Sequence, residues 1–133
     1  MNWVEERINT IFTKVCDDVS VLETYYPDLN FTMDDDENLE PKFPTVYMFF
    51  DFVERGTTLD GGVINAVYMT VRTRVSVTKE QGNNVARDVN NAVRESLARL
   101  FFITSGSPIP TKSGDIKVIN ANYHRVIGFN DPI

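Results

Sequence analysis

The chain has 133 residues, a hydrophobic fraction of 42% and a formal net charge of -6 at pH 7, which fits one globular domain over residues 1–133 with a sizeable core. The acidic balance argues against a general nucleic-acid binder, which would normally be basic in order to neutralise phosphates. A single cysteine, Cys16, excludes an internal disulfide, and no apolar run reaches the roughly 18 residues of a membrane helix.

The N-terminal stretch predicts an amphipathic helix over residues 3–23. Asn2 is a suitable N-cap, and Glu5 and Glu6 lie in the first turn, where the helix dipole favours negative charge. Pro27 marks the end of the helical pattern. The same stretch lacks the basic and apolar regions of a secretory signal, so we expect the protein to work in the cytoplasm where it is made. The apolar stripe consists of Val4, Ile8, Ile11, Phe12, Val15, Val19 and Leu22.

Residues 28–42 have a different composition and are predicted to form an exposed acidic loop. The dense run from Asp34 to Glu37 is followed by Pro41. A solvated loop is the simple interpretation of such a charge run. The alternative is a metal site built on carboxylates. The run lacks the spaced Asp-x-Asp-x-Asp-Gly pattern of a calcium loop, so we predict no metal there.

A long β-hairpin is predicted from two strands, residues 43–55 and 65–77, joined by a glycine-containing tip at 56–62. The second strand alternates apolar and polar residues, so one side faces the core and the other is open. The first strand is apolar on both sides and needs cover on both. Both strands exceed the usual five or six residues, so we expect the tip to project. In the first strand Val46, Met48, Phe50 and Phe52 share one face, and Tyr47, Phe49 and Val53 lie on the other.

Arg72 and Arg74 lie on the open side of the second strand, about 7 Å apart. One interpretation is a solvated face with a cross-strand partner such as Asp51, because opposite charges often pair across strands. A second is contact with a neighbouring subunit, since arginine suits an interfacial ion pair better than lysine. A third is phosphate contact, which the overall acidity disfavours. We expect a neighbouring subunit or the wall of a shared channel.

A second helix is predicted from a capping box at Thr78 and Gln81 to about residue 103, with Gly106 as its stop. Its apolar stripe consists of Val85, Val89, Ala92, Val93, Leu97, Leu100 and Phe101. Residues 105–114 are predicted to be a loop, because they are rich in Gly, Ser and Pro. The remaining chain supports one or two strands, in which Arg125 interrupts the alternation of Ile119, Ala121, Tyr123, Ile127 and Phe129.

This order of elements predicts an α+β fold. An antiparallel sheet is built on the long hairpin, and the two helices pack on one of its faces in order to bury their apolar stripes. The other face of the sheet is then open, unless an oligomer covers it.

The sequence offers no convincing catalytic constellation. His124 is the single histidine and has no second histidine or nearby cysteine for a zinc site. Cys16 lies beside the apolar stripe of the first helix, with no basic neighbour to lower its pKa. No glycine-rich phosphate loop is present. We therefore expect a structural or binding role without enzyme activity, metal or cofactor. A small-molecule-binding domain, or an enzyme using Cys16 or His124, is the less favoured alternative.

The layout resembles the tail terminator and tail-completion proteins of long-tailed bacteriophages. The features that carry the resemblance are the first helix, the acidic loop, a strand that starts with Phe43, Pro44, Thr45 and Val46, the long hairpin, and the helix VARDVNNAVRESLARLF followed by terminal strands. The resemblance spans most of the chain and is one of layout more than of motif.

The resemblance implies a subunit of a virion, assembled in the host cytoplasm into a hexameric ring. Such a ring would cap the tail tube, end its polymerisation and help join the tail to the head. Its partners would be copies of itself, the tail-tube protein and neck or head-completion proteins, and genomic DNA would pass through without specific binding. A tail-tube or neck adaptor subunit is the alternative. The candidate interface residues are Tyr47, Phe49, Asp51, Thr57, Thr58, Leu59, Asp60, Tyr68, Arg72 and Arg74.

Overall fold

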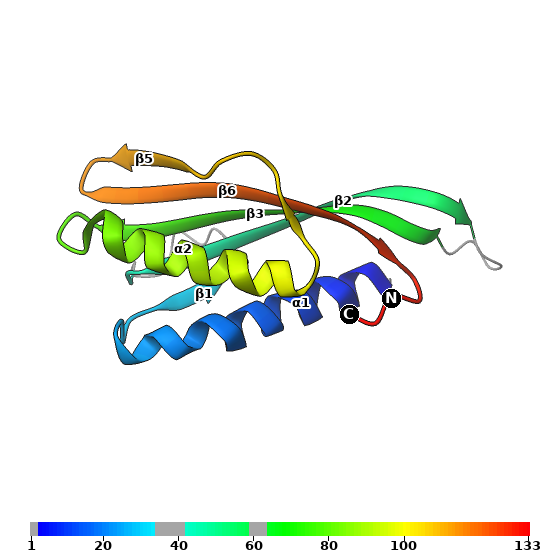
Figure 1. The fold of residues 1–133 in the computed structure, drawn as a ribbon, viewed down its shortest axis with the longest axis horizontal. Coiled ribbons are helices and arrows are strands. Elements are labelled where there is room, and N and C mark those ends of the chain that lie inside the picture. The colour runs from blue at the N-terminus through cyan, green and yellow to red at the C-terminus, as the bar shows by residue number, and fades with distance from the viewer. Residues whose placement is uncertain (1–2, 34–41, 59–63) are drawn as a thin grey trace.

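The structure, a computed structural model, describes residues 3–33, 42–58 and 64–133. Its elements are arranged as an α+β fold, in which helices cover one face of a mixed, mostly antiparallel sheet (Figure 1). In chain order they are α1 (Trp3–Val19), the 3₁₀ helix η1 (Ser20–Thr24), β1 (Asn30–Thr32), β2 (Thr45–Thr58), β3 (Ile64–Thr78), α2 (Gly82–Arg99), β4 (Ile103–Thr104), β5 (Ile109–Ser113) and β6 (Ile116–Gly128). The predicted fold class is confirmed.

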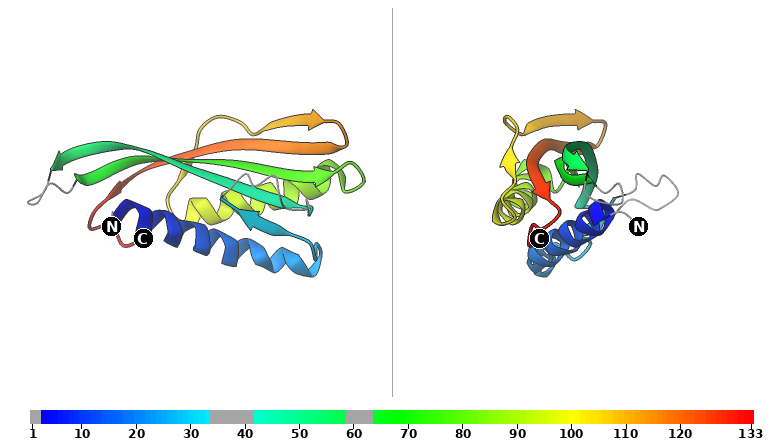
Figure 2. Two further views of the ribbon diagram at one scale, coloured as in Figure 1. Left: turned by 180° about the vertical axis from the view of Figure 1, so that it is seen from behind. Right: turned by 90° about the vertical axis from the view of Figure 1, so that its right-hand side faces the viewer.

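The core lies between the helices and one face of the sheet, as the alternation in the sequence predicts. Val46 and Met48 of β2 and Val71 and Val75 of β3 are fully buried, and Tyr123 of β6 is buried beside them. Burying each such side chain contributes about 1.5–3 kcal/mol relative to leaving it exposed. Figure 2 shows the two helices on the same side of the sheet, and neither of them covers the other side.

The β2–β3 hairpin is longer than predicted. Its register pairs Thr45 with Ser76 and Arg55 with Ala66, and it is irregular between Arg55 and Thr58. Residues 56–58, predicted to belong to the tip, continue β2, because the irregularity accommodates Gly56 and two β-branched threonines follow. The rest of the predicted tip, which includes Leu59 and Asp60, lies outside the described residues. The hairpin extends past the N-terminal end of α1 (Figure 1).

The first helix ends earlier than predicted. The α-helix stops at Val19, and residues 20–24 form η1. The Ser20 hydroxyl donates a hydrogen bond to the carbonyl oxygen of Asp17 at 2.8 Å. Serine side chains that bond the backbone in this way compete with the helical ladder.

The predicted loop at 28–42 contains a short strand, β1, which was not predicted. β1 runs parallel to β2 and pairs Asn30 with Thr45, so the sheet is mixed where an antiparallel one was predicted. The Asn30 side chain donates to the Thr45 hydroxyl at 3.2 Å, and its backbone N–H donates to the carbonyl oxygen of Pro44 at 3.0 Å. The peptide bond between Phe43 and Pro44 is cis.

The predicted capping box forms, but as a turn ahead of the helix. The Thr78 N–H donates to Gln81 Oε1 at 3.1 Å, and the Gln81 N–H donates to Thr78 Oγ1 at 3.2 Å. Gly82, with φ 78°, then leads the chain into α2. The same Gln81 side chain donates to the carbonyl oxygen of Phe43 at 3.1 Å, which ties the start of α2 to the start of β2.

The second helix ends at Arg99, short of the predicted residue 103 and well before Gly106. Phe101, with φ 67°, stops it. The Phe102 N–H donates to the Leu97 carbonyl oxygen at 3.0 Å and the Phe101 N–H to that of Ala98 at 2.9 Å, which is the Schellman pattern. The predicted stop at Gly106 is wrong, because a phenylalanine takes the position at the helix end that glycine usually occupies.

The last third of the chain forms three strands. β6 is one long strand, and β4 and β5 pair with different parts of it. The predicted loop at 105–114 is therefore wrong at β5. Pro110 is tolerated there, because among the described strands β5 pairs with β6 alone and needs no second ladder of donors. Arg125 interrupts the alternation of β6 because it donates to the Leu100 carbonyl oxygen at 2.7 Å and pairs with Asp131.

Candidate interaction surface

The face of the sheet opposite the helices, called here the open sheet face, is built from cross-strand rows of β2, β3 and β6. Residues directly opposite each other in an antiparallel pair point to the same side of the sheet. The register therefore aligns alternate residues of the strands into continuous rows. These rows are Tyr47–Arg74–Asn120, Phe49–Arg72–Asn122, Asp51–Thr70–His124 and Val53–Tyr68–Val126.

Six of the ten candidate interface residues lie together on the open sheet face. They are Tyr47, Phe49, Asp51, Tyr68, Arg72 and Arg74. Thr57 and Thr58 lie in the last part of β2, where the structure describes the backbone and not the side chains. Leu59 and Asp60 lie outside the described residues.

The arginines of this face lie over its aromatic rings. The guanidinium carbon of Arg74 is 4.9 Å from the ring centre of Tyr47, and that of Arg72 is 5.9 Å from the ring centre of Phe49. At exposed sites such cation–π contacts contribute about 0.5–1 kcal/mol each. Farther along the hairpin, Arg55 lies over Tyr68 at 5.1 Å.

The expected pairing of Arg72 with Asp51 is present and weak. Arg72 Nη2 and Asp51 Oδ2 are 3.9 Å apart, and both side chains are more than half exposed. Exposed pairs of this kind contribute about 0–1 kcal/mol, because water screens the charges. The pairing of Arg72 with Asp51 therefore contributes little to the stability of the subunit.

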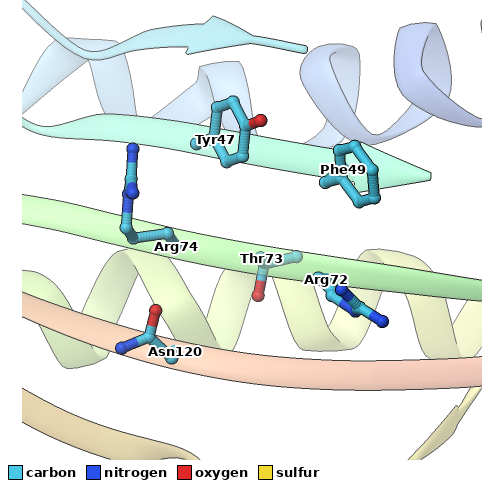
Figure 3. A pocket seen from close by; sticks show the side chains of 6 residues that line it. All are labelled: Tyr47, Phe49, Arg72, Thr73, Arg74 and Asn120. Atoms are coloured by element: carbon cyan, nitrogen blue, oxygen red, sulfur yellow. The ribbon is translucent and has the colours of Figure 1, made fainter. Parts of the chain in front are cut away.

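A shallow depression of about 310 Å³ lies at one end of the open sheet face (Figure 3). Tyr47 and Phe49 form its wall on β2, and Arg72 and Arg74 line it from β3. Asn120 contributes an amide from β6. Figure 3 shows these side chains arranged across three neighbouring strands, so the depression is a hollow in the sheet surface, bounded by aromatic, cationic and amide groups.

Several exposed apolar side chains extend this surface, and the candidate set did not include them. Val53 is 65% exposed and Val126 49%, and both lie in one row with Tyr68. Ile103 of β4 pairs with His124 and is 63% exposed; Ile109 of β5 pairs with Asn120 and is 61% exposed. The two isoleucines were missed because their segments were predicted as a helix end and a loop.

His124 and Cys16 have ordinary structural surroundings. The His124 ring is half-buried and stacks on Tyr68 with ring centres 5.6 Å apart, and its Nδ1 lies within hydrogen-bond distance of the Ser105 hydroxyl. Cys16 is half-buried, and burial, followed by the charge of Asp17, raises the pKa of its thiol to about 11. The thiol is therefore protonated at neutral pH and lacks the thiolate that a nucleophile needs.

Among residues 3–33, 42–58 and 64–133, no group of three or more histidine, cysteine or acidic side chains is arranged to hold a metal ion. No helix in the described part of the chain is long and apolar enough to cross a membrane. Comparison with protein-family models and with curated proteins finds no match for this chain.

Proposed function

We propose that this protein is a structural subunit of a bacteriophage tail that assembles into a ring, caps the tail tube and helps join tail to head. The single observation that carries the proposal is the open sheet face. Arginines lie over the rings of Tyr47, Phe49 and Tyr68 on this face. It also exposes five large apolar side chains, which are Phe49, Val53, Ile103, Ile109 and Val126. A surface of this kind on a globular protein marks a site that another macromolecule covers.

The composition of the open sheet face supports a protein partner. Aromatic residues and arginine are enriched in the buried centres of protein–protein interfaces, where lysine is depleted. The described cations of this face are Arg55, Arg72 and Arg74, without lysine. A face built in this way suits permanent contact between subunits.

The projecting hairpin and the overall charge also support the proposal. A hairpin that extends past the body of a subunit provides a second element with which to reach a neighbour or the tube. The net charge of -6 suits the wall of a conduit, because an acidic ring does not grip the DNA that passes through it.

The proposal is tested in the phage that carries the gene. A stop codon early in the reading frame removes the subunit that ends tube growth, so we expect overlong tubes and heads without tails in electron micrographs. Supplying the protein from a plasmid should restore normal length. Tails of normal length and normal joining in the mutant would refute the proposed function.

A tail-tube or neck adaptor subunit is the second candidate, and the same open sheet face favours it, because tubes and adaptors also bury sheet faces between copies. The two candidates differ in the assembly they predict. A tube subunit polymerises alone into long filaments, whereas a terminator forms closed rings. Negative-stain electron microscopy of the purified protein distinguishes them.

A further inference from the structure

The molecule has two exposed surfaces of opposite charge, and each contains apolar side chains. The open sheet face is the basic one. Among the described residues of this face, three arginines, at positions 55, 72 and 74, stand against one aspartate, Asp51. The chain as a whole has more acidic than basic residues, whereas on the described part of this face the arginines outnumber the carboxylate.

The acidic surface is a groove of about 370 Å³. It lies between α2 on one side and the end of α1 with η1 on the other. Asp18, Asp88 and Glu95 line it with carboxylates. Arg99 is its cation, and its guanidinium is already 3.2 Å from Asp18. Val21, 68% exposed, and Leu22 form the apolar part of the groove. Tyr25, 74% exposed, lies one 3₁₀ turn beyond.

These two surfaces lie on opposite sides of the molecule. The groove belongs to the helical layer, and the open sheet face looks away from that layer (Figures 1 and 2). One copy therefore cannot bring its own two surfaces together. A second copy can place its groove on the open sheet face of the first and leave both copies with one free surface each.

We propose that the open sheet face of one copy docks on the acidic groove of a second copy, so that subunits associate head to tail. Arg72 and Arg74 then face Asp88 and Glu95, and the exposed aliphatic side chains of the sheet cover Val21. The inference rests on the proposed function and deepens it, because a head-to-tail contact between identical subunits generates a ring when the rotation per step closes.

Two other occupants of the open sheet face fit less well. A second open sheet face would bring arginines against arginines, and like charges across an interface are unfavourable. Single-stranded nucleic acid binds by stacking bases on free aromatic faces. Here a guanidinium group of the same molecule lies over each of the rings of Tyr47, Phe49 and Tyr68, so these aromatic faces are occupied.

The test exchanges the charges of the two surfaces. A sheet variant carries Arg72→Glu and Arg74→Glu, a groove variant carries Asp88→Lys and Glu95→Lys, and a swapped variant carries all four. Sedimentation velocity at low salt should show self-association of the wild type, weakened by roughly tenfold or more in the sheet variant and in the groove variant. Mixing these two variants should restore association, and the swapped variant should associate with itself.

Matched controls change the net charge equally at exposed positions outside both surfaces. Lys79→Glu with Arg87→Glu matches the sheet variant, and Glu80→Lys with Asp115→Lys matches the groove variant. Both controls should associate like the wild type. Circular dichroism of every variant should show the wild-type spectrum, so that loss of association is not loss of the fold.

Three outcomes would overturn the inference. One is a wild-type protein that stays monomeric at every concentration. Another is a groove variant that associates as the wild type does, since the contact would then join two open sheet faces. The third is binding of a fluorescent oligothymidylate that only the sheet variant loses, which would make the face a nucleic-acid platform. Association through both surfaces combined with normal tails in the stop-codon phage would refute the proposed function alone.

Discussion

At the scale of single residues, Phe101 has an unusual backbone conformation. Residues with a side chain rarely adopt positive φ, because the Cβ then crowds the following carbonyl oxygen, and the cost is about 1–2 kcal/mol. Phe101 has φ 67° and is 76% exposed, so its ring is not held by burial in the core. Its ring contact is with Arg125, whose guanidinium carbon lies 5.7 Å from the ring centre.

Replacing Phe101 should separate backbone strain from the side-chain contact. Phe101→Ala keeps the strain and removes the ring, whereas Phe101→Gly removes both. We expect the glycine variant to have a free energy of unfolding about 1 kcal/mol above that of the alanine variant, measured by urea denaturation. Equal stabilities of the two variants would contradict the assignment of strain to this position.

At the scale of elements, Asp18 connects α1 to α2. The buried Ser96 hydroxyl donates to Asp18 Oδ2 at 2.7 Å, and Arg99 Nη2 lies 3.2 Å from the same oxygen. The hydrogen bond from Ser96 and the charge of Arg99 hold the pKa of Asp18 below its ordinary value, against the opposing effect of desolvation. The two helices are therefore joined by a polar contact at the edge of their apolar interface.

The lowered pKa of Asp18 predicts how stability changes with pH. The folded state favours the carboxylate, so its contribution is complete above the ordinary pKa of an aspartate and is lost as pH falls through the lower folded pKa. Asp18→Asn keeps an oxygen acceptor for Ser96 and removes the charge. We expect it to lower the free energy of unfolding at pH 7 by about 1 kcal/mol, since solvent screens this exposed group.

The measurement is a set of urea denaturations of wild type and Asp18→Asn between pH 7 and pH 2. The difference in stability should shrink as pH falls through the folded pKa. Asp17→Asn, on the neighbouring exposed carboxylate of α1, is the matched control and should change stability little. A difference that stays constant over the whole pH range would show that the charge of Asp18 does not stabilise the helix pair.

At the scale of the whole molecule, one face of the sheet is buried under the helices and the other face is exposed. The same three strands supply the fully buried residues of the core and the exposed residues of the open sheet face. Within the described residues the helices cover one face only, so the stability of the subunit and its association depend on different sides of the same strands.

Substitutions on the two faces should therefore have separate effects. Val53→Ser combined with Val126→Ser changes two exposed positions, so we expect the free energy of unfolding to stay within about 0.5 kcal/mol of the wild type and self-association to weaken. Val71→Ser, on the buried side of β3, should cost more than about 2 kcal/mol. Thermal denaturation and sedimentation velocity measure the two effects. A double variant that unfolds more readily and associates normally would contradict the assignment.

The sequence was informative wherever a pattern was long. The stripe of α1 and the alternation of β2, β3 and β6 were recognised, because burial of one side repeats over many residues. Short elements contain too few residues to show a recognisable alternation of apolar and polar side chains. β1 has three residues beside an acidic run and β4 has two, and their pairing depends on neighbours that are distant in sequence. The end of α2 was misplaced, because its stop uses Phe101 in place of glycine.

The alternation of residues 65–77 by itself determined that Arg72 and Arg74 share a side with Tyr68 and oppose the valines, because side chains of a strand alternate with a period of two. Only the tertiary structure decided what surrounds them. Strand register, which is fixed by contacts between distant segments, placed Arg72 and Arg74 over Phe49 and Tyr47. The same register brought Ile103 and Ile109 to this face, and within the described residues the helices leave it open, since α1 and α2 pack against the other side.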